Sequence, residues 1–200
     1  MPSPKRPAEP APKVPDLFRA RDLEALGYPK SRLTAWIREG KAERIERGLY
    51  RRTDAEGSEL ETIAMVAKRV PRAVVCLLTA LRVHEIGTQS PHAVWIALDR
   101  KARPPRLAPV KLQVVRFAPK LLTHGVEHLE VLGVSIQITS PARTIVDCFR
   151  YRRKIGLDVA LEALSDGLRR KRVTVAQLLR AAEVASMARV MRPYLESLTR

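Results

Sequence analysis

Aromatic residues, cysteines and long apolar runs are all scarce in this 200-residue sequence, and each scarcity excludes a class of protein. Aromatic residues make up only 4% of the chain, and its longest uncharged apolar stretch covers residues 73–81. That stretch is far shorter than the roughly 20 residues of a membrane-spanning helix, so we expect no membrane partner. The two cysteines, Cys76 and Cys148, have no ligand spacing around them. This pattern excludes a disulfide scaffold and indicates a reducing, cytoplasmic setting.

The first 15 residues, MPSPKRPAEPAPKVP, also lack the apolar core of a secretory signal. They are rich in proline, carry Lys5, Arg6 and Lys13, and contain few apolar side chains. Such a segment cannot bury enough apolar surface to offset the entropy lost on ordering. We therefore predict a disordered, weakly basic tail over residues 1–15, either an inert leader or an arm that touches DNA.

Acidic residues are too few to balance the basic ones. The chain has 37 Lys and Arg residues against 21 Asp and Glu, which gives a net charge of +16 and an isoelectric point near 10.7. A field of this sign attracts polyanions, and nucleic acid is the first candidate. The alternative is a basic surface that only reflects the amino-acid usage of an arginine-rich proteome.

Residues 16–54 have the pattern of a small DNA-binding domain. The sequence predicts a helix over 20–26 that stops at Gly27, and a second helix over 31–39 that stops at Gly40. A hairpin over 41–52 follows, with its turn at residues 46–48. Helix, glycine turn, helix and hairpin is the order of a winged helix-turn-helix.

The second of these helices has the features of a recognition helix. Leu33 and Ile37 are spaced four residues apart, so we expect both to face inward, with Trp36 at the edge. The opposite face then presents four side chains that suit a major groove, namely Ser31, Arg32, Ala35 and Arg38. On the hairpin, Arg47 and Arg51 are placed to reach phosphate or the minor groove. The alternative is a winged helix that contacts protein and whose charges are merely solvated.

The rest of the chain predicts a larger mixed body over residues 58–200. A capping box at 58–61 opens a helix to Arg69, and strands are expected over 93–98, 111–117 and 127–138, the last broken at Gly133. From Ser140 onward the pattern is helical. The predicted fold class is therefore α+β, with an N-terminal winged helix-turn-helix, a mixed α/β domain and a helical C-terminal tail.

Two motifs resemble one protein family. The run G-x-x-x-R-I-x-R-G-L-Y, at residues 40–50, follows an apolar helix as it does in the N-terminal domain of the AbiEi antitoxin family. The stretch ITSPARTIVDCFRY, at residues 138–151, is similar to the start of that family's C-terminal helical region. Relatives begin with a full first helix, whereas here the proline-rich tail takes its place.

The resemblance implies a transcriptional repressor and antitoxin of a type IV toxin–antitoxin, or abortive infection, system for antiviral defense. It implies binding to inverted repeats in the promoter of its own operon. It also implies a nucleotidyltransferase-like toxin that the C-terminal domain counters, without a tight complex. By position, Lys30 joins the helix contacts and Arg44 the wing. The candidate DNA contacts are Lys30, Ser31, Arg32, Ala35, Arg38, Lys41, Arg44, Arg47 and Arg51.

Signals for an enzyme are weak, and we expect no catalytic residue, no metal and no cofactor. His124 and His128 are four residues apart without a supporting glutamate pattern, and Asp99 with Lys101 only faintly suggests nuclease chemistry. Residues 100–120 hold seven basic side chains and no acidic one. This basic run either forms a second nucleic-acid surface or is merely solvated. The alternative functions are a metal-dependent nuclease or an RNA-binding protein targeted by the winged helix.

Overall fold

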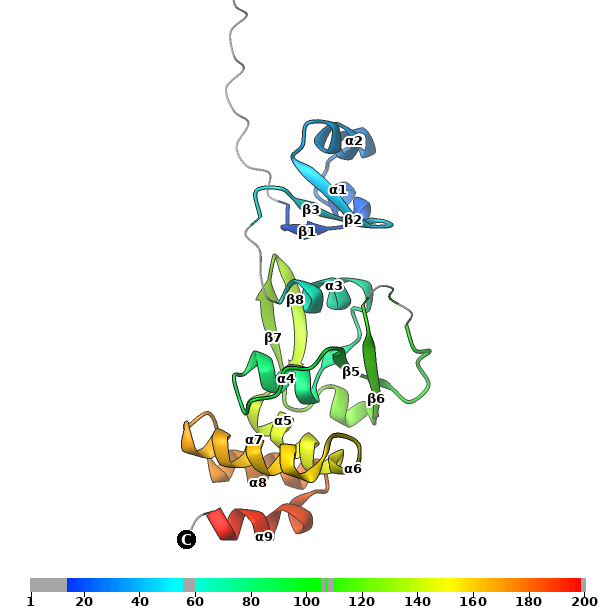
Figure 1. The fold of residues 1–200 in the computed structure, drawn as a ribbon. Helices are drawn as coiled ribbons and strands as arrows, with labels where there is room; N and C mark the ends of the chain where they lie inside the picture. The colour runs from blue at the N-terminus through cyan, green and yellow to red at the C-terminus, as the bar shows by residue number, and fades with distance from the viewer. Residues whose placement is uncertain (1–13, 56–59, 106, 108–109, 199–200) are drawn as a thin grey trace, which may run out of the picture. The chain divides into compact units, whose positions relative to one another are not determined.

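The computed structural model describes residues 14–55, 60–105, 107 and 110–198, so residues 1–13 of the tail predicted over residues 1–15 lie outside them. The chain divides into two compact units, one of residues 1–58 with 132–134 and one of residues 59–131 with 135–200 (Figure 1). Each unit contains both helices and strands, so the predicted α+β class is confirmed.

The first unit consists of two short helices and a three-stranded antiparallel sheet of order β1-β3-β2. Its elements are β1 (Leu17–Phe18), α1 (Ala20–Ala25), α2 (Lys30–Arg38), β2 (Ala42–Glu46) and β3 (Leu49–Arg52). Gly27 follows α1 and Gly40 follows α2, both at positive φ, where a glycine ends a helix without a steric penalty. The predicted order of elements is present, and β1, which pairs with β3, is an element that the sequence did not predict.

Aromatic packing holds this unit together. The ring of Phe18 lies edge-on to Trp36 at 6.3 Å and stacks on Tyr50 at 6.0 Å, and Tyr28 contacts Trp36 at 5.5 Å. Val14, which the sequence placed in the disordered tail, is also buried in this core, so that prediction was wrong for this residue. Aromatic pairs contribute roughly 0.5–1.5 kcal/mol beyond their buried area, so an aromatic-poor chain stabilises a very small domain with four of its nine aromatic rings.

The structure corrects the predicted inner face of α2. Leu33 and Trp36 are the buried residues, at 8% and 3% exposed, whereas Ile37 is 43% exposed. The prediction that Ile37 faces inward and Trp36 lies at the edge was therefore wrong. The indole fills the space against Phe18 and Tyr28, and the helix is turned so that the larger ring is the one removed from water.

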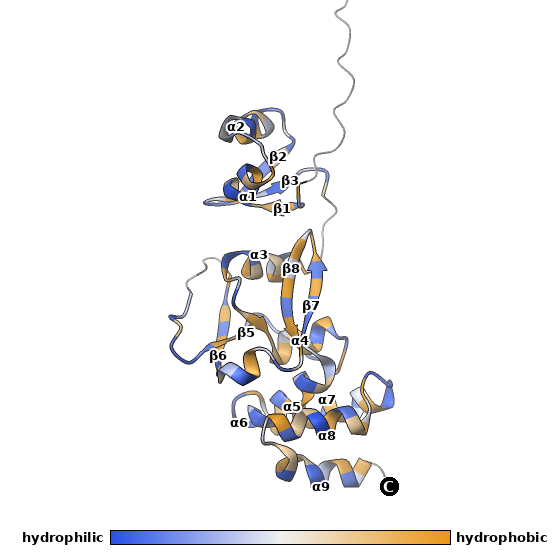
Figure 2. Cartoon of the chain, turned by 180° about the vertical axis from the view of Figure 1, so that it is seen from behind, coloured by the Kyte–Doolittle hydropathy of each residue, from blue (hydrophilic) through white to orange (hydrophobic). Residues whose placement is uncertain are grey.

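The second unit is built on a five-stranded mixed sheet of order β6-β5-β4-β8-β7, with β5 parallel to β6, β4 antiparallel to β5 and β4 parallel to β8. Strand β5 is apolar and buried from Val94 to Leu98, and it crosses the unit as a continuous apolar band (Figure 2). The strands are β4 (Val74–Val75), β5 (Val94–Asp99), β6 (Leu112–Phe117), β7 (Val126–Val131) and β8 (Val134–Thr139).

Helices cover this sheet, and the C-terminal ones form a layer around α5 (Figure 1). Strands and helices lie close to their predicted ranges, but α3 begins at Glu61 with Leu60 as its N-cap, and Ser58 of the predicted capping box lies outside the described residues. The helices are α3 (Glu61–Arg69), α4 (Leu77–Val83), the 3-10 turn η1 (Pro119–Leu122), α5 (Pro141–Arg150), α6 (Arg152–Ile155), α7 (Leu157–Arg169), α8 (Val175–Val184) and α9 (Ala188–Leu198).

A fully buried ion pair ties α5 into the second unit. The Nε of Arg143 donates to Oδ2 of Asp147 at 3.0 Å, its Nη1 donates to the carbonyl of His124 at 2.7 Å, and its guanidinium lies 5.1 Å from the centre of the Phe117 ring. Both side chains are 0% exposed. Burial raises the pKa of Asp147 to about 6, although the Arg143 charge opposes that rise.

The residues around this pair belong to the second sequence motif, at 138–151, and their contacts show its structural role. Ser140 caps α5 by accepting a hydrogen bond from the Arg143 amide, and Pro141 occupies the first helical position. The hydroxyl of Thr144 donates to the carbonyl of Thr139 at 3.0 Å, where His84 Nε2 also makes a hydrogen bond at 2.7 Å. The motif residues therefore join the end of β8 to the start of α5.

We expect Trp36→Ala to destabilise the first unit by about 3–5 kcal/mol, because it leaves a cavity between α2 and the sheet. The matched change Ile37→Ala removes an exposed side chain and is expected to cost about 0.5 kcal/mol or less. Hydrogen exchange of backbone amides in residues 17–52, followed by mass spectrometry, measures both. A larger loss of protection in Ile37→Ala would contradict the orientation of α2.

We expect Asp147→Asn to destabilise the second unit by about 3–5 kcal/mol, because it leaves the buried Arg143 charge without its partner. The double variant Arg143→Leu/Asp147→Leu is expected to recover most of that loss, since it buries no charge at all. Urea denaturation followed by circular dichroism measures both. Equal destabilisation by the single and double variants would show that the pair is not the cause.

Candidate nucleic-acid interface

Helix α2 presents a polar face without an acidic side chain. Between Lys30 and Arg38 it has no Asp or Glu, whereas α1 carries Asp22 and Glu24. Ser31 and Arg38 are exposed and Ala35 is half-buried, as expected for the outward side of the helix. The side chain of Lys30 lies outside the described residues.

Arg32 lies at the border of this face rather than at its centre. Its side chain is half-buried, and its guanidinium carbon lies 5.8 Å from the centre of the Trp36 ring. Because each helical residue turns by about 100°, the burial of Leu33 and Trp36 centres the outward face on Ser31, Thr34, Ala35 and Arg38. Thr34 is exposed and was missed by the sequence prediction, which placed the inward face on Ile37 instead of Trp36.

The hairpin β2–β3 carries the other predicted contacts. Arg47 is exposed in the turn, beside Gly48 at φ +77°, which lets the chain reverse between the strands. Arg44 is also exposed, and its Nε donates to the carbonyl of Glu46 at 3.3 Å. The hairpin therefore bears two exposed guanidinium groups within four residues, one in β2 and one in the turn.

Two other predicted contacts have carboxylate partners in the same unit. Lys41 Nζ lies 2.8 Å from Oε2 of Glu39, and the Lys41 ammonium lowers the pKa of that carboxyl. Arg51 Nε donates to Oε1 of Glu43 at 2.8 Å. The sequence placed these bases correctly on the hairpin region, but it could not show that part of their charge is already matched.

Arg52 has a structural role. It donates through Nε to Oδ1 of Asp54 at 2.9 Å and through Nη1 to the Val14 carbonyl at 3.3 Å. The bond to Asp54 raises the pKa of Arg52 and lowers that of the carboxyl. This residue therefore holds the start of the unit against the end of β3.

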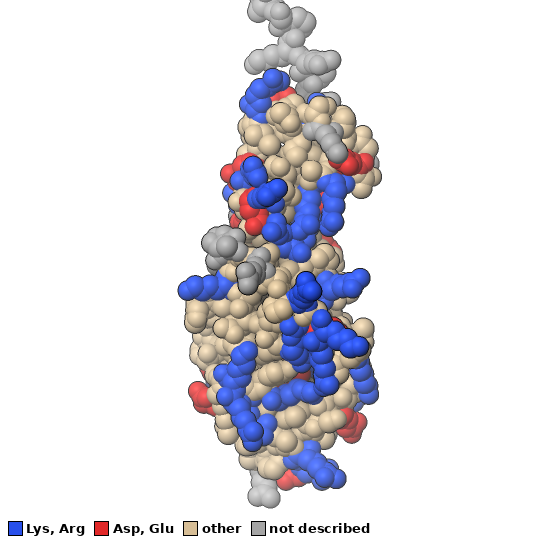
Figure 3. Space-filling model, turned by 90° about the vertical axis from the view of Figure 1, so that its right-hand side faces the viewer, with Lys and Arg blue, Asp and Glu red and all other residues tan. Residues whose placement is uncertain are grey.

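The second unit also has a basic surface, and one face of it shows many Lys and Arg side chains and few acidic ones (Figure 3). Among the basic residues of the run over residues 100–120, Arg116 makes a hydrogen bond within the unit, since its Nη1 donates to the carbonyl of Asp99 at 2.8 Å. Arg106 lies outside the described residues. The exposed members are Arg100, Lys101, Arg103, Lys111 and Lys120.

The residues considered for catalysis do not converge. His124 and His128 are exposed, and His128 Nδ1 makes a hydrogen bond with the Ser135 hydroxyl at 3.3 Å. Asp99 accepts the backbone amide of Lys101 at 2.9 Å, as in a turn. Within residues 14–55, 60–105, 107 and 110–198 there is no group of three or more His, Cys, Asp or Glu side chains that could hold a metal ion. Burial raises the pKa of both the Cys76 and the Cys148 thiol. None of the helices in those residues is long and apolar enough to span a bilayer.

Comparison with known proteins bears on each unit differently. The chain is similar to the crystal structure of the RV2827C protein from Mycobacterium tuberculosis, with a TM-score of 0.51 and 14% sequence identity over 86% of this chain and 67% of that one. At this identity the likeness concerns the fold alone. No curated protein matches the sequence.

The family comparison covers the first unit. Residues 8–53 match the model of a family described as transcriptional regulator, AbiEi antitoxin. This range contains α1, α2, the hairpin and the R-I-x-R-G-L-Y motif, so the resemblance drawn from that motif is confirmed for the N-terminal part of the chain. The similarity to this family therefore extends over residues 8–53 of the 200-residue chain.

Proposed function

We propose that the first unit is a winged helix-turn-helix domain that binds duplex DNA, with α2 as its recognition helix and the β2–β3 hairpin as its wing. The observation that carries this proposal is the outward face of α2, which combines Ser31, Ala35 and Arg38 and has no carboxylate along the helix. A helix that enters a major groove needs such a face, because the phosphates on both sides repel acidic side chains.

The side chains of α2 are suited to contact bases, and those of the wing are suited to contact phosphates. An arginine on α2 can contact guanine O6 and N7 together, a serine can donate or accept at either base, and the methyl groups of Thr34 and Ala35 suit a thymine methyl. On the wing, Arg44 and Arg47 contact phosphate, which positions α2 without reading sequence. The remaining contacts are Lys30, Arg32, Lys41 and Arg51.

We further propose that the whole protein is a transcriptional repressor and the antitoxin of a type IV toxin–antitoxin system. The AbiEi family match over residues 8–53 supports this role. The protein would bind inverted repeats in the promoter of its own operon, where two copies occupy two half-sites. The second unit would counter a nucleotidyltransferase-like toxin without forming a tight complex, in the cytoplasm and as part of antiviral defense.

We expect Arg32→Ala to weaken binding to the promoter of the protein's own operon by about 1–3 kcal/mol and to reduce the preference for that duplex over a scrambled one, as loss of a base contact does. Arg47→Ala is expected to weaken both duplexes alike and to reduce the slope of log K against log salt by about 1. Gel shift and fluorescence anisotropy at several salt concentrations measure both effects.

A control separates these effects from a general loss of positive charge. Arg189→Ala removes an exposed base from α9, in the other unit, and is expected to change neither affinity nor specificity. Equal losses on promoter and scrambled DNA for Arg32→Ala would refute its role in reading bases. Cleavage of the duplex that depends on Mg²⁺ would favour a nuclease, and preference for RNA over the duplex would favour an RNA-binding protein.

We expect Glu43→Gln to strengthen binding to both duplexes several-fold, because it releases the Arg51 guanidinium from a carboxylate and removes a negative charge from the wing. The gain should shrink as salt rises, since it is electrostatic. The double variant Glu43→Gln/Arg51→Ala should lose the gain if Arg51 is the phosphate contact. Weaker binding by Glu43→Gln would show that the ion pair is needed to shape the hairpin.

A further inference from the structure

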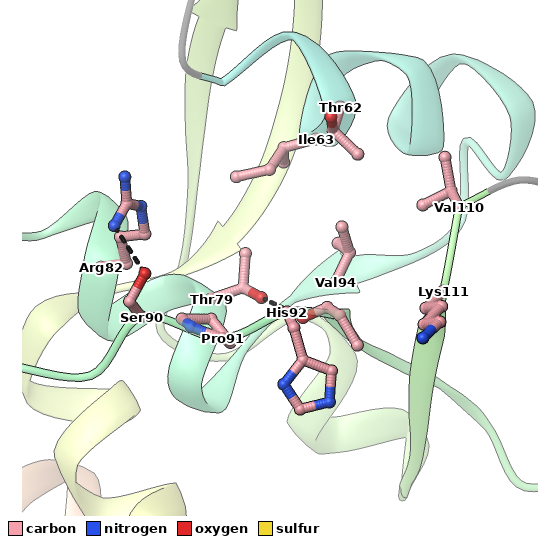
Figure 4. Close-up of a pocket in the computed structure, with 11 residues that line it drawn as sticks. Thr62, Ile63, Thr79, Arg82, Ser90, Pro91, His92, Val94, Val110 and Lys111 are labelled. Atoms are coloured by element: carbon pink, nitrogen blue, oxygen red, sulfur yellow. Dashed lines mark hydrogen bonds between the residues drawn. The ribbon is translucent and has the colours of Figure 1, made fainter.

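A cavity of about 590 Å³ opens in the second unit, and none of its described lining residues is among those proposed to bind DNA. Its walls are the first turn of α3, helix α4, the segment that enters β5 and the residues that enter β6 (Figure 4). This volume is in the range of about 300–1,000 Å³ typical of small-molecule sites. The cavity is therefore large enough for a compact organic ligand.

One part of this cavity is apolar. Ile63 from α3, Val94 from β5, and Pro91 and Val110 from the adjoining segments line it. Figure 4 shows Ile63 and Val94 in the middle of the cavity, between its two ends. Branched aliphatic side chains of this kind pack well against a flat ring, because a ring buries a large apolar area with little loss of conformational entropy.

The charged side chains of the cavity are both basic. Arg82 and Lys111 line it, and none of its described lining residues is Asp or Glu. Arg82 and Lys111 lie at opposite ends in Figure 4. Arg82 Nη1 donates to the Ser90 hydroxyl at 3.1 Å, so this guanidinium is already oriented before a ligand arrives. The cavity therefore favours an anion.

The wall formed by α3 adds to this preference. Thr62 and Ile63 belong to the first turn of the nine-residue helix, whose amide groups have a partial positive charge. The acidic residue of that turn, Glu61, is not among the lining residues.

We propose that this cavity binds a nucleoside monophosphate, with the base against Ile63, Val94 and Val110 and the phosphate held by Arg82 or Lys111. A phosphate with an aromatic base attached fits both halves of the lining, whereas inorganic phosphate leaves the apolar part empty and a free nucleoside leaves the basic groups unmatched. This binding is separate from the proposed contact of α2 with DNA.

The test is calorimetric titration of the full chain with AMP and GMP at physiological salt. We expect saturable binding at one site per chain, and binding of adenosine, guanosine and inorganic phosphate weaker by at least about tenfold. Whichever of Arg82 and Lys111 holds the phosphate, its change to alanine should weaken nucleotide binding by about tenfold, and the change of the other, at the opposite end of the cavity, should weaken it less. No saturable binding, or equally tight binding of inorganic phosphate, would overturn the proposal.

Two matched variants distinguish the cavity from the general positive charge of the chain. Lys120→Ala removes an exposed base that does not line the cavity, and it should leave nucleotide binding unchanged. Val110→Trp fills the cavity from a half-buried position and should abolish binding, with circular dichroism to show that the protein is folded. An equal loss in Lys120→Ala, or full binding by a folded Val110→Trp variant, would overturn the proposal.

A last variant separates this proposal from DNA binding. Arg32→Ala should leave nucleotide binding unchanged, because Arg32 lies in the first unit and the cavity lies in the second. Failure of the promoter gel shift with intact nucleotide binding would overturn only the proposed DNA contact. Displacement of the nucleotide by duplex DNA, in the wild type and in Arg32→Ala alike, would assign the cavity to a nucleic-acid surface and overturn the nucleotide site.

Discussion

The burial of the Trp36 indole against Phe18 determines which way helix α2 faces, and the proposed DNA contacts depend on that orientation. A nine-residue helix carries too little propensity of its own to be stable in water, so its packing decides its position. With Trp36 and Leu33 inward, Ser31, Ala35 and Arg38 lie outward and Arg32 lies at the edge, across the Trp36 ring. A rotation that buried Ile37 instead would move every one of these side chains relative to a groove.

The net charge of +16 does not show how the acidic and basic side chains are distributed within the first unit. Helix α2 has no acidic residue, whereas the segment after it pairs Lys41 with Glu39 and Arg51 with Glu43. Such exposed pairs contribute little to stability, at most about 1 kcal/mol each. Their effect on a phosphate partner is larger, because every retained carboxylate lowers the local potential that the partner meets.

In the second unit, the position of α5 depends on a buried charge rather than on aromatic packing. Arg143 and Asp147 are not exposed to water, so removing either one would leave a buried charge without a partner and would destabilise the fold. The hydrogen bond from Arg143 to the carbonyl of His124 joins α5 to the loop at that residue. These residues of the motif at 138–151 therefore stabilise the fold from its interior. The exposed bases on its surface and the cavity beside α3 differ in kind, since the lining of the cavity combines basic groups with apolar side chains.

The order of elements and the α+β class followed from local signals: the glycines after the helices, the Ser140-Pro141 helix start and the alternation in the strands. The R-I-x-R-G-L-Y run carried the resemblance of the N-terminal segment to a known family. These signals act between residues close in the chain, which is why the sequence alone revealed them. The inward turn of Trp36, the strand β1 and the walls of the cavity depend on residues far apart in the chain. Only the tertiary structure decided them, because each depends on which side chain best fills the space left by a distant neighbour.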